Sequence, residues 1–242
     1  MSESYRESHK GKGVDYDDSF RTEPYRAMLW RIEQRVLERL VPELLPNGVA
    51  EYLDFACGTG RVLAFLGRFA SSTTGVDVSE NMLDVARRNA PEADLRCGDL
   101  TAEPLLADRK FDLISAFRFF PNAEDKLRSD AMAALIRHLA PSGVLIFNNH
   151  TSAYSLPRRI AGLLGRESHS PGYRLMARAE AEALVTRAGL RIVRQVPIAS
   201  LPMTERHLLR PLAFFESIER ALTRVPATLP IAQNIIYACR LA

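Results

Sequence analysis

The sequence predicts an α/β protein built on a doubly wound, mostly parallel sheet. Apolar runs typical of buried strands alternate with amphipathic segments between residues 50 and 147. This alternation is typical of parallel strands that are joined by helices on both faces of one sheet. A glycine-containing turn joins the first strand to the next helix, and an acidic residue ends the strand that follows. Open sheets of this class bind ligands at that edge.

The turn has the sequence Asp-Phe-Ala-Cys-Gly-Thr-Gly at residues 54–60, and residues 61–70 after it carry apolar side chains at helical spacing. Gly58 and Gly60 let the backbone approach a ligand where a Cβ atom would collide. The N-terminus of the following helix offers N–H groups to an anion. Residues 74–77 are expected to form a short strand that ends in Asp77, an acid placed to bind a ribose. The turn therefore predicts a site for a ribose-containing ligand with a carboxylate or phosphate.

These residues, with the motifs that follow them, resemble the class I S-adenosylmethionine-dependent methyltransferases. Five motifs carry the resemblance, in the order usual for the family: residues 54–60, 75–83, 97–100, 111–117 and 139–147. They resemble the glycine turn, the second strand with its ribose-binding acid, and the ends of the third, fourth and fifth strands. The one departure is Ala56, where many members have glycine.

The resemblance implies a seven-stranded sheet with an antiparallel last strand between strands five and six. It also implies S-adenosyl-L-methionine as methyl donor, S-adenosyl-L-homocysteine as product, and no metal. Asp77 would accept hydrogen bonds from both ribose hydroxyls, and Asp99 would accept one from the adenine amino group. The implied cofactor-binding residues are Asp54, Ala56, Cys57, Gly58, Gly60, Asp77, Val78, Met82, Asp99, Leu100, Ala116 and Phe117.

Two other classes of protein stay open. An NAD-binding oxidoreductase also places an acid after its second strand. Its fingerprint requires a third glycine three residues after the second, where this chain has Leu63. A noncatalytic binding subunit with the methyltransferase fold is the other alternative, and the intact turn with Asp77 and Asp99 argues against it.

Composition agrees with a globular enzyme. The chain has 242 residues, of which 47% are hydrophobic and 25% charged, and these are ordinary globular values. No apolar run approaches the roughly 20 residues of a membrane span, and the polar first ten residues do not resemble a signal peptide. Three unclustered cysteines suggest reduced thiols. These features predict a cytoplasmic protein of bacterial type.

Charge is distributed unevenly along the chain. The net charge is +3, but residues 158–224 contain 12 arginines against 6 glutamates. Such a basic segment suits an anionic substrate or an acidic lipid surface, but solvated helix faces are the favoured explanation. Aromatic and basic residues are not interleaved, which disfavours a nucleic-acid partner.

The chain divides into three expected parts. Residues 1–45 form an N-terminal arm and cap helix, residues 46–150 the cofactor-binding half, and residues 151–242 the acceptor-side half. Residues 151–173 and residues 202–230 are expected to act as lids. Outside the five motifs the expected elements are helices at 25–44, 129–139, 177–188 and 208–225, and strands at 191–199 and 234–241.

Methyl transfer is an in-line displacement, so the protein mainly has to align the acceptor with the methyl group. A hydroxyl acceptor also needs a base, for which histidine is the usual choice. His150 is the one histidine at the end of a central strand on the ligand-binding edge. Of its neighbours Asn148 and Asn149, one could orient the acceptor. The alternative is that His150 only binds loop backbone.

Further residues are expected around the acceptor. Arg118 and Asn122 follow the fourth strand and should face the acceptor pocket, together with Tyr16 and Tyr25. The function predicted is methylation of a small molecule on oxygen or nitrogen in a biosynthetic pathway. The arginines of both lids predict an acceptor with an apolar body and an anionic group. Peripheral membrane contact, and a monomer or homodimer, stay open.

Overall fold

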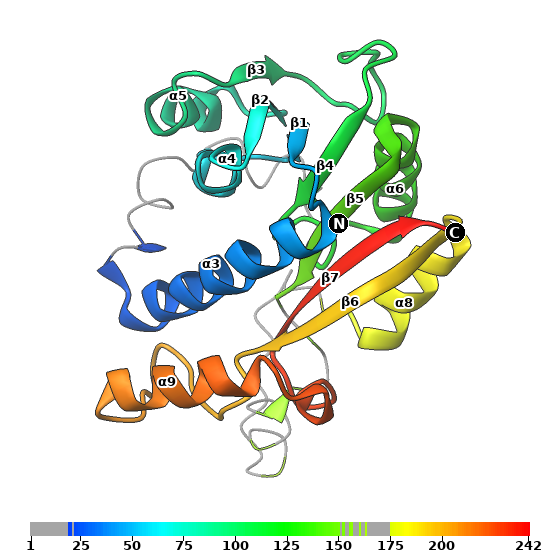
Figure 1. The fold of residues 1–242 in the computed structure, drawn as a ribbon. Helices are drawn as coiled ribbons and strands as arrows, with labels where there is room; N and C mark the ends of the chain where they lie inside the picture. The colour runs from blue at the N-terminus through cyan, green and yellow to red at the C-terminus, as the bar shows by residue number, and fades with distance from the viewer. Residues whose placement is uncertain are drawn as a thin grey trace, which may run out of the picture.

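The structure is a computed structural model that describes residues 19–20, 22–150, 152, 155–156, 160, 163 and 175–242. Tyr16 and most of the expected lid at 151–173 lie outside the described residues. Figure 1 shows one sheet covered by helices on both faces. Its strands are β1 (Val49–Phe55), β2 (Ala70–Asp77), β3 (Asp94–Cys97), β4 (Phe111–Ala116), β5 (Leu139–Asn149), β6 (Leu190–Ile198) and β7 (Asn234–Leu241).

The sheet has the order β3-β2-β1-β4-β5-β7-β6. Neighbouring strands from β3 to β5 are parallel, whereas β7 is antiparallel to both β5 and β6. The sheet is therefore mixed in its last third, and the position of β7 confirms the topology that the resemblance implied. The helices are α3 (Pro24–Leu44), α4 (Arg61–Gly67), α5 (Glu80–Asn89), α6 (Asp125–His138), α8 (Arg178–Arg187) and α9 (Leu212–Leu222), with a 3₁₀ turn, η1 (Pro226–Thr228).

Alternate strand residues feed two separate cores. In β7, Ile235 and Tyr237 pack in the core shared with α6 and α8, while Ile236 and Ala238 pack in the core shared with α3 and α4. This follows from the two-residue period of a strand. Because both faces are covered, the central strands are apolar along most of their length, as parallel strands usually are. The carboxyl ends of β1, β2 and β4 are thus held rigidly at one edge.

Several element boundaries differ from the expectations. The helix expected at 61–70 ends at Gly67, because Ala70 already pairs with Val49 as the first residue of β2. The helix expected to start at residue 129 begins at Asp125, in a polar first turn that apolar periodicity does not mark. By contrast, α3 ends at Leu44 as expected, with Pro42 inside its last turn.

The apolar stripe expected as one helix at 208–225 is shorter in the structure. The helical part is α9, and Leu208 packs against the α3 core from the preceding loop. Val225 lies beyond the helix and is 40% exposed. Apolar spacing predicts which side chains face inward, but a loop residue can satisfy it as well as a helical one.

No helix in the described part of the chain combines the length and apolar character needed to cross a membrane. Across the same residues, no group of three or more histidine, cysteine, aspartate or glutamate side chains is arranged to hold a metal ion. The three cysteines are free thiols, and Cys97 is the exposed one.

Candidate active site

A cleft opens where β1, β2 and β4 end. The loops after these strands and after β3, with the starts of α4, α5 and α6, supply its walls. The lining residues are Asp54, Phe55, Ala56, Cys57, Gly58, Thr59, Arg61, Val62, Val76, Asp77, Val78, Met82, Gly98, Asp99, Leu100, Thr101, Phe117, Arg118, Phe119, Asn122 and Leu127.

The two glycines of the turn have different roles. Both have left-handed backbones, with φ of 54° at Gly58 and 77° at Gly60. A Cβ atom on Gly58 would meet no protein atom within 4 Å, so that position faces open space, whereas one on Gly60 would lie 3.0 Å from Ala86. Gly58 therefore keeps space for a ligand, and Gly60 allows α4 to approach α5. Of the two glycines expected to serve the ligand, Gly58 lines the cleft and Gly60 does not.

The Asp77 carboxylate holds the turn in place from the end of β2. Its Oδ2 accepts a hydrogen bond from the Gly58 backbone N–H at 2.8 Å, and its Oδ1 accepts one from the Ser79 N–H at 2.9 Å. A carboxylate has about four acceptor positions. This oriented carboxylate lines the cleft.

Asp99 lies in the loop after β3, across the cleft from the turn. Its Oδ1 accepts hydrogen bonds from the Thr101 N–H at 2.9 Å and the Thr101 hydroxyl at 2.7 Å. These two bonds fix the orientation of the carboxylate. The preceding Gly98 has φ of 153° and also lines the cleft.

Asp54 is a buried carboxyl under the floor of the cleft, 2% exposed. Its Oδ1 accepts a hydrogen bond of 2.5 Å from the Ser115 hydroxyl, which also contacts the Tyr52 hydroxyl at 2.7 Å. Its Oδ2 has no hydrogen-bond partner among the described residues. Burial raises the pKa of Asp54 to about 7, although the Ser115 hydrogen bond and the charge of Arg61 oppose this rise. A cationic ligand group at Oδ2 would stabilise the ionised form.

Two arginines stack on Phe20 at the rim of the cleft. The Arg61 guanidinium lies 4.0 Å from the Phe20 ring centroid and 3.9 Å from that of Trp30. The Arg118 guanidinium lies 4.7 Å from the Phe20 ring. Arg118 has φ of 60°, and its N–H donates to Asn148 Oδ1 at 2.7 Å. Arg61 was missed by the sequence reasoning, although it directly follows the glycine turn.

Arg118 and Asn122 both line the cleft, as expected for residues near the acceptor. The Asn122 amide donates to the Arg118 carbonyl at 2.6 Å, which closes the turn after β4. Phe119 packs edge-on against Phe55 with ring centroids 4.8 Å apart. This wall of the cleft therefore combines aromatic surface with a guanidinium.

His150 directly follows β5 and does not line the cleft. Burial and the positive charges of Arg118 and Arg26 hold its pKa well below the usual value, so the imidazole is neutral at pH 7. Its Nδ1 is buried without a hydrogen-bond partner among the described residues. Both neighbouring asparagines are fully buried and bind protein groups: Asn148 accepts from Arg118, and Asn149 donates to the Met176 carbonyl at 2.7 Å. Neither asparagine faces an acceptor.

Tyr25 does not meet the expectation that it faces the acceptor pocket. It lies in the first turn of α3 and is 5% exposed, and its hydroxyl donates to Gln233 Oε1 at 3.1 Å. Burial and the charges of Glu219 and Glu205 raise its pKa. Tyr25 therefore anchors the start of α3 to the loop before β7.

The structure brings most of the expected cofactor residues together, but Gly60 and Ala116 lie behind the cleft surface. No lining residue comes from 202–230. That segment contributes α9, which packs beside α3 and β6. The expected lid over the cleft is thus not what the described part of 202–230 forms.

Comparisons with known proteins agree with this arrangement. Residues 53–143 match the family model of a methyltransferase domain. The chain is 30% identical over 148 residues to dTDP-3-amino-3,6-dideoxy-alpha-D-glucopyranose N,N-dimethyltransferase of Streptomyces fradiae, covering 60% of this chain and 51% of the relative. It is 34% identical over 111 residues to a ubiquinone biosynthesis O-methyltransferase of Coxiella burnetii, covering 42% and 45%. The chain spans about half the length of the curated relatives it matches.

Solved structures resemble nearly the whole chain. DesVI of Streptomyces venezuelae has a TM-score of 0.58 at 21% identity, covering 96% of this chain and all of that one (100%). A SAM-dependent methyltransferase of Thermotoga maritima, described as a possible histamine N-methyltransferase, has a TM-score of 0.64 at 18% identity, covering 94% and 95%. At these identities the likeness concerns the fold.

Proposed function

Because the chain has the fold of the class I S-adenosylmethionine-dependent methyltransferases and carries a methyltransferase domain at residues 53–143, we propose that it methylates a small molecule on nitrogen or oxygen. S-adenosylmethionine supplies a sulfonium methyl group for in-line transfer. The observation that carries the proposal is that Gly58, Asp77 and Asp99 line one cleft from three different strand ends.

The residues present fit this cofactor. Asp77 binds the ribose hydroxyls, since its carboxylate is already oriented by two backbone N–H groups. Asp99, held by Thr101, accepts from the adenine amino group. At the methionine end, Gly58 leaves room for the ligand, and the buried Asp54 Oδ2, without a protein partner among the described residues, accepts from the amino group.

The acceptor lies beside Arg118, Asn122 and Phe119, which form the part of the cleft not used by these cofactor contacts. One relative is named as an N,N-dimethyltransferase of a dTDP-linked amino sugar. Another is named as a ubiquinone biosynthesis O-methyltransferase. An acceptor with an apolar body and an anionic group matches the aromatic wall and the Arg118 guanidinium. Alignment of the acceptor is the main contribution of these residues to the reaction.

His150 is proposed as a base only for a hydroxyl acceptor. Its imidazole is neutral and so able to accept a proton, but its lowered pKa makes it a weak base. Because His150 lies behind the cleft surface, an acceptor hydroxyl would have to reach its imidazole past Arg118. A His150→Gln variant with unchanged turnover at every pH would remove it from the mechanism.

The function is tested by incubating the purified protein with S-adenosylmethionine labelled in the methyl group and a small-molecule extract. Transfer of the labelled methyl group to a small molecule supports the proposal. A rise in melting temperature with S-adenosylhomocysteine and none with NAD separates it from the oxidoreductase reading. Cofactor binding without transfer to any amine, hydroxyl or extract component would instead indicate a noncatalytic subunit.

Asp99 should determine the specificity for adenine. S-inosylhomocysteine has a carbonyl oxygen in place of the adenine amino group. The Asp99 carboxylate would therefore face a second hydrogen-bond acceptor. We expect S-inosylhomocysteine to bind at least about tenfold more weakly than S-adenosylhomocysteine, since an unpaired polar group costs about 1–3 kcal/mol. Competition calorimetry with the two analogues measures this difference, and equal affinities would contradict the role of Asp99.

Asp54 should make the stability of the unliganded protein depend on pH. Its pKa of about 7 in the folded state exceeds the ordinary value of 3.8, so the folded state holds a proton that the unfolded state has lost. The free energy of unfolding therefore falls as pH rises from about 4 to about 7, by up to about 4 kcal/mol from this group.

Urea titrations at several pH values compare the wild type with Asp54→Asn, which cannot ionise. The variant should lack this fall, so its stability relative to the wild type should increase between pH 4 and pH 7. Parallel pH profiles of the two proteins would show that Asp54 is not protonated in the folded state.

A further inference from the structure

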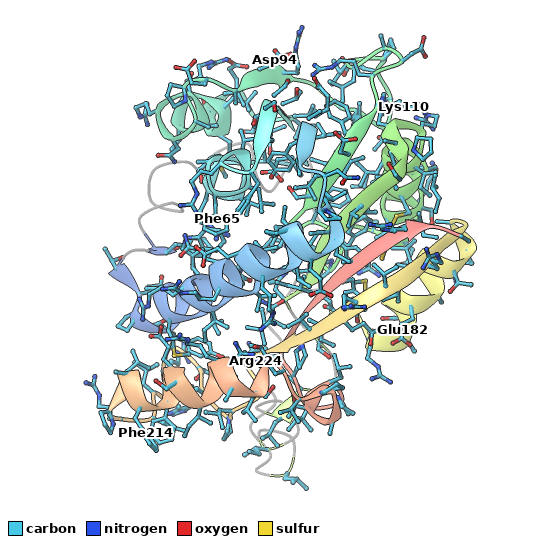
Figure 2. All side chains as sticks on the ribbon, in the orientation of Figure 1. Phe65, Asp94, Lys110, Glu182, Phe214 and Arg224 are labelled. Carbon is cyan, nitrogen blue, oxygen red and sulfur yellow. The ribbon has the colours of Figure 1, made fainter. Side chains whose placement is uncertain are left out.

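A second site lies between α3 and α9, on a part of the surface that shares no residue with the cleft. Arg35 and Arg39 of α3, Arg220 of α9 and Arg224 of the turn after α9 line a groove together with Ile32 and Val36. Figure 2 labels Arg224 beside the C-terminal end of α9. The groove therefore gathers four arginines from α3, α9 and the turn that follows α9.

The two helices run side by side in the same direction, as the colours of Figure 1 show. Arg31 donates to Glu216 through Nε at 3.1 Å and Nη2 at 2.6 Å. Four residues further along the chain from Arg31 and Glu216, about one helical turn, Arg35 and Arg220 face each other. Four residues beyond these, Arg39 faces Arg224. One pair of opposite charge is thus followed by two pairs of like charge.

Nearby carboxylates do not neutralise these pairs. Arg35 contacts Glu38 at 3.2 Å, but among the described residues Arg39, Arg220 and Arg224 form no ion pair or side-chain hydrogen bond. Glu219, which precedes Arg220 in α9, is 1% exposed and accepts from the Ser200 and Leu201 backbone N–H groups instead. About three positive charges therefore line the groove without a counter-charge from the described residues.

Helix electrostatics explain only half of this arrangement. Arg220 lies in the last turn of α9 and Arg224 lies just after its end, where the helix dipole favours positive charge. Arg35 and Arg39 lie within α3, away from its ends, so the dipole gives them no advantage. Facing like charges destabilise a helix pair, and an anion in the groove would reverse the sign of that interaction.

We propose that this groove binds a phosphate group, either of a soluble phosphate compound or of a phospholipid. Guanidinium groups donate in a planar fork that matches phosphate oxygens bidentately. Near pH 7 a phosphomonoester carries about 1.5 to 2 negative charges and a diphosphate carries more, so either offsets more of the charge of three arginines than a single carboxylate does. The binding is independent of the cleft and therefore of the proposed methyl transfer.

Calorimetric titration of the full chain with pyrophosphate, in sodium chloride of matched ionic strength, tests the soluble source. Sedimentation with phosphatidylcholine vesicles, with and without phosphatidic acid, tests the lipid source. The variant Arg39→Gln/Arg224→Gln should bind the effective probe about tenfold more weakly or worse. The control Arg88→Gln/Arg187→Gln removes the same charge from exposed sites on α5 and α8 and should remain within about twofold of the wild type.

A second measurement uses Arg220→Glu, which puts a carboxylate opposite Arg35. Without pyrophosphate this variant should melt at a higher temperature than the wild type, and it should lose the rise in melting temperature that the effective probe gives the wild type. Binding of either probe that depends on the groove supports the proposal and identifies the source. If the wild type binds neither probe, or the control variant loses as much affinity as the groove variant, the site does not exist.

Discussion

Replacing Asp77 by alanine should weaken S-adenosylmethionine binding by roughly 1.5–3 kcal/mol, as is typical when a charge-assisted hydrogen bond is lost. Its carboxylate accepts from Gly58 and Ser79, so the variant loses the proposed ribose contact and loosens the glycine turn together. Isothermal titration calorimetry with S-adenosylhomocysteine measures the change. Unchanged affinity would remove Asp77 from the site.

A matched control and an analogue separate the two effects. Asp84→Ala changes an exposed aspartate on α5 whose ion pair with Arg87 is a surface one, and it should leave affinity unchanged. An analogue of S-adenosylhomocysteine without a ribose hydroxyl should bind the wild type more weakly than S-adenosylhomocysteine does. The same removal should weaken binding to Asp77→Ala much less, because a direct contact makes the loss of the hydroxyl and the loss of the carboxylate non-additive. Additive losses would mean that Asp77 acts only through the turn.

Replacing Glu33 by alanine should destabilise the protein by about 3 kcal/mol or more, the usual result of breaking a buried charge pair. Glu33 is fully buried in α3, and its Oε1 accepts from the Asn234 amide at 2.7 Å. Its other carboxylate oxygen lies 3.9 Å from an Arg61 nitrogen. The substitution therefore leaves a buried amide and a nearly buried guanidinium without their carboxylate.

Urea denaturation compares the stability of Glu33→Ala with that of Glu38→Ala, a control substitution in the same helix. Glu38 is an exposed partner of Arg35 and Arg68, so its loss should cost within about 1 kcal/mol. Glu33→Gln keeps an oxygen acceptor for Asn234 and should fall between the two. Equal stabilities of the two alanine variants would show that the Glu33 network contributes nothing to folding.

The network around Glu33 also connects the fold to the cleft. Asn148 lies within 3.5 Å of Glu33 Oε1 and accepts from the Arg118 N–H, so α3, β5 and the turn after β4 are joined through buried polar groups. We expect Glu33→Ala to disturb Arg118 and Arg61 at the rim as well. The sequence showed Glu33 only as a polar residue in an amphipathic helix, since burial of a carboxylate leaves no mark in apolar spacing.

The sequence alone determined the sheet class and placed Gly58, Asp77 and Asp99 after strand ends, while the family resemblance implied the position of the last strand. Each of these residues sits where an apolar strand ends, and parallel strands bring their carboxyl ends to one edge whatever the rest of the chain does. The local pattern therefore predicted that these three residues share one cleft. Arg118 and Asn122, which were expected near the acceptor because they follow β4, line the same cleft.

Only the tertiary structure decided which partners the long polar side chains bind and which element covers the second apolar stripe. Tyr25 and one of the two residues Asn148 and Asn149 were expected at the acceptor, but all three bind protein groups in the interior. The stripe at 208–225 was expected above the cleft, and α9 instead lies beside α3. Periodicity records which face of an element is apolar, but not which other element covers that face or which polar partner meets a side chain. Those choices depend on groups far apart in the chain and exist only once the chain is folded.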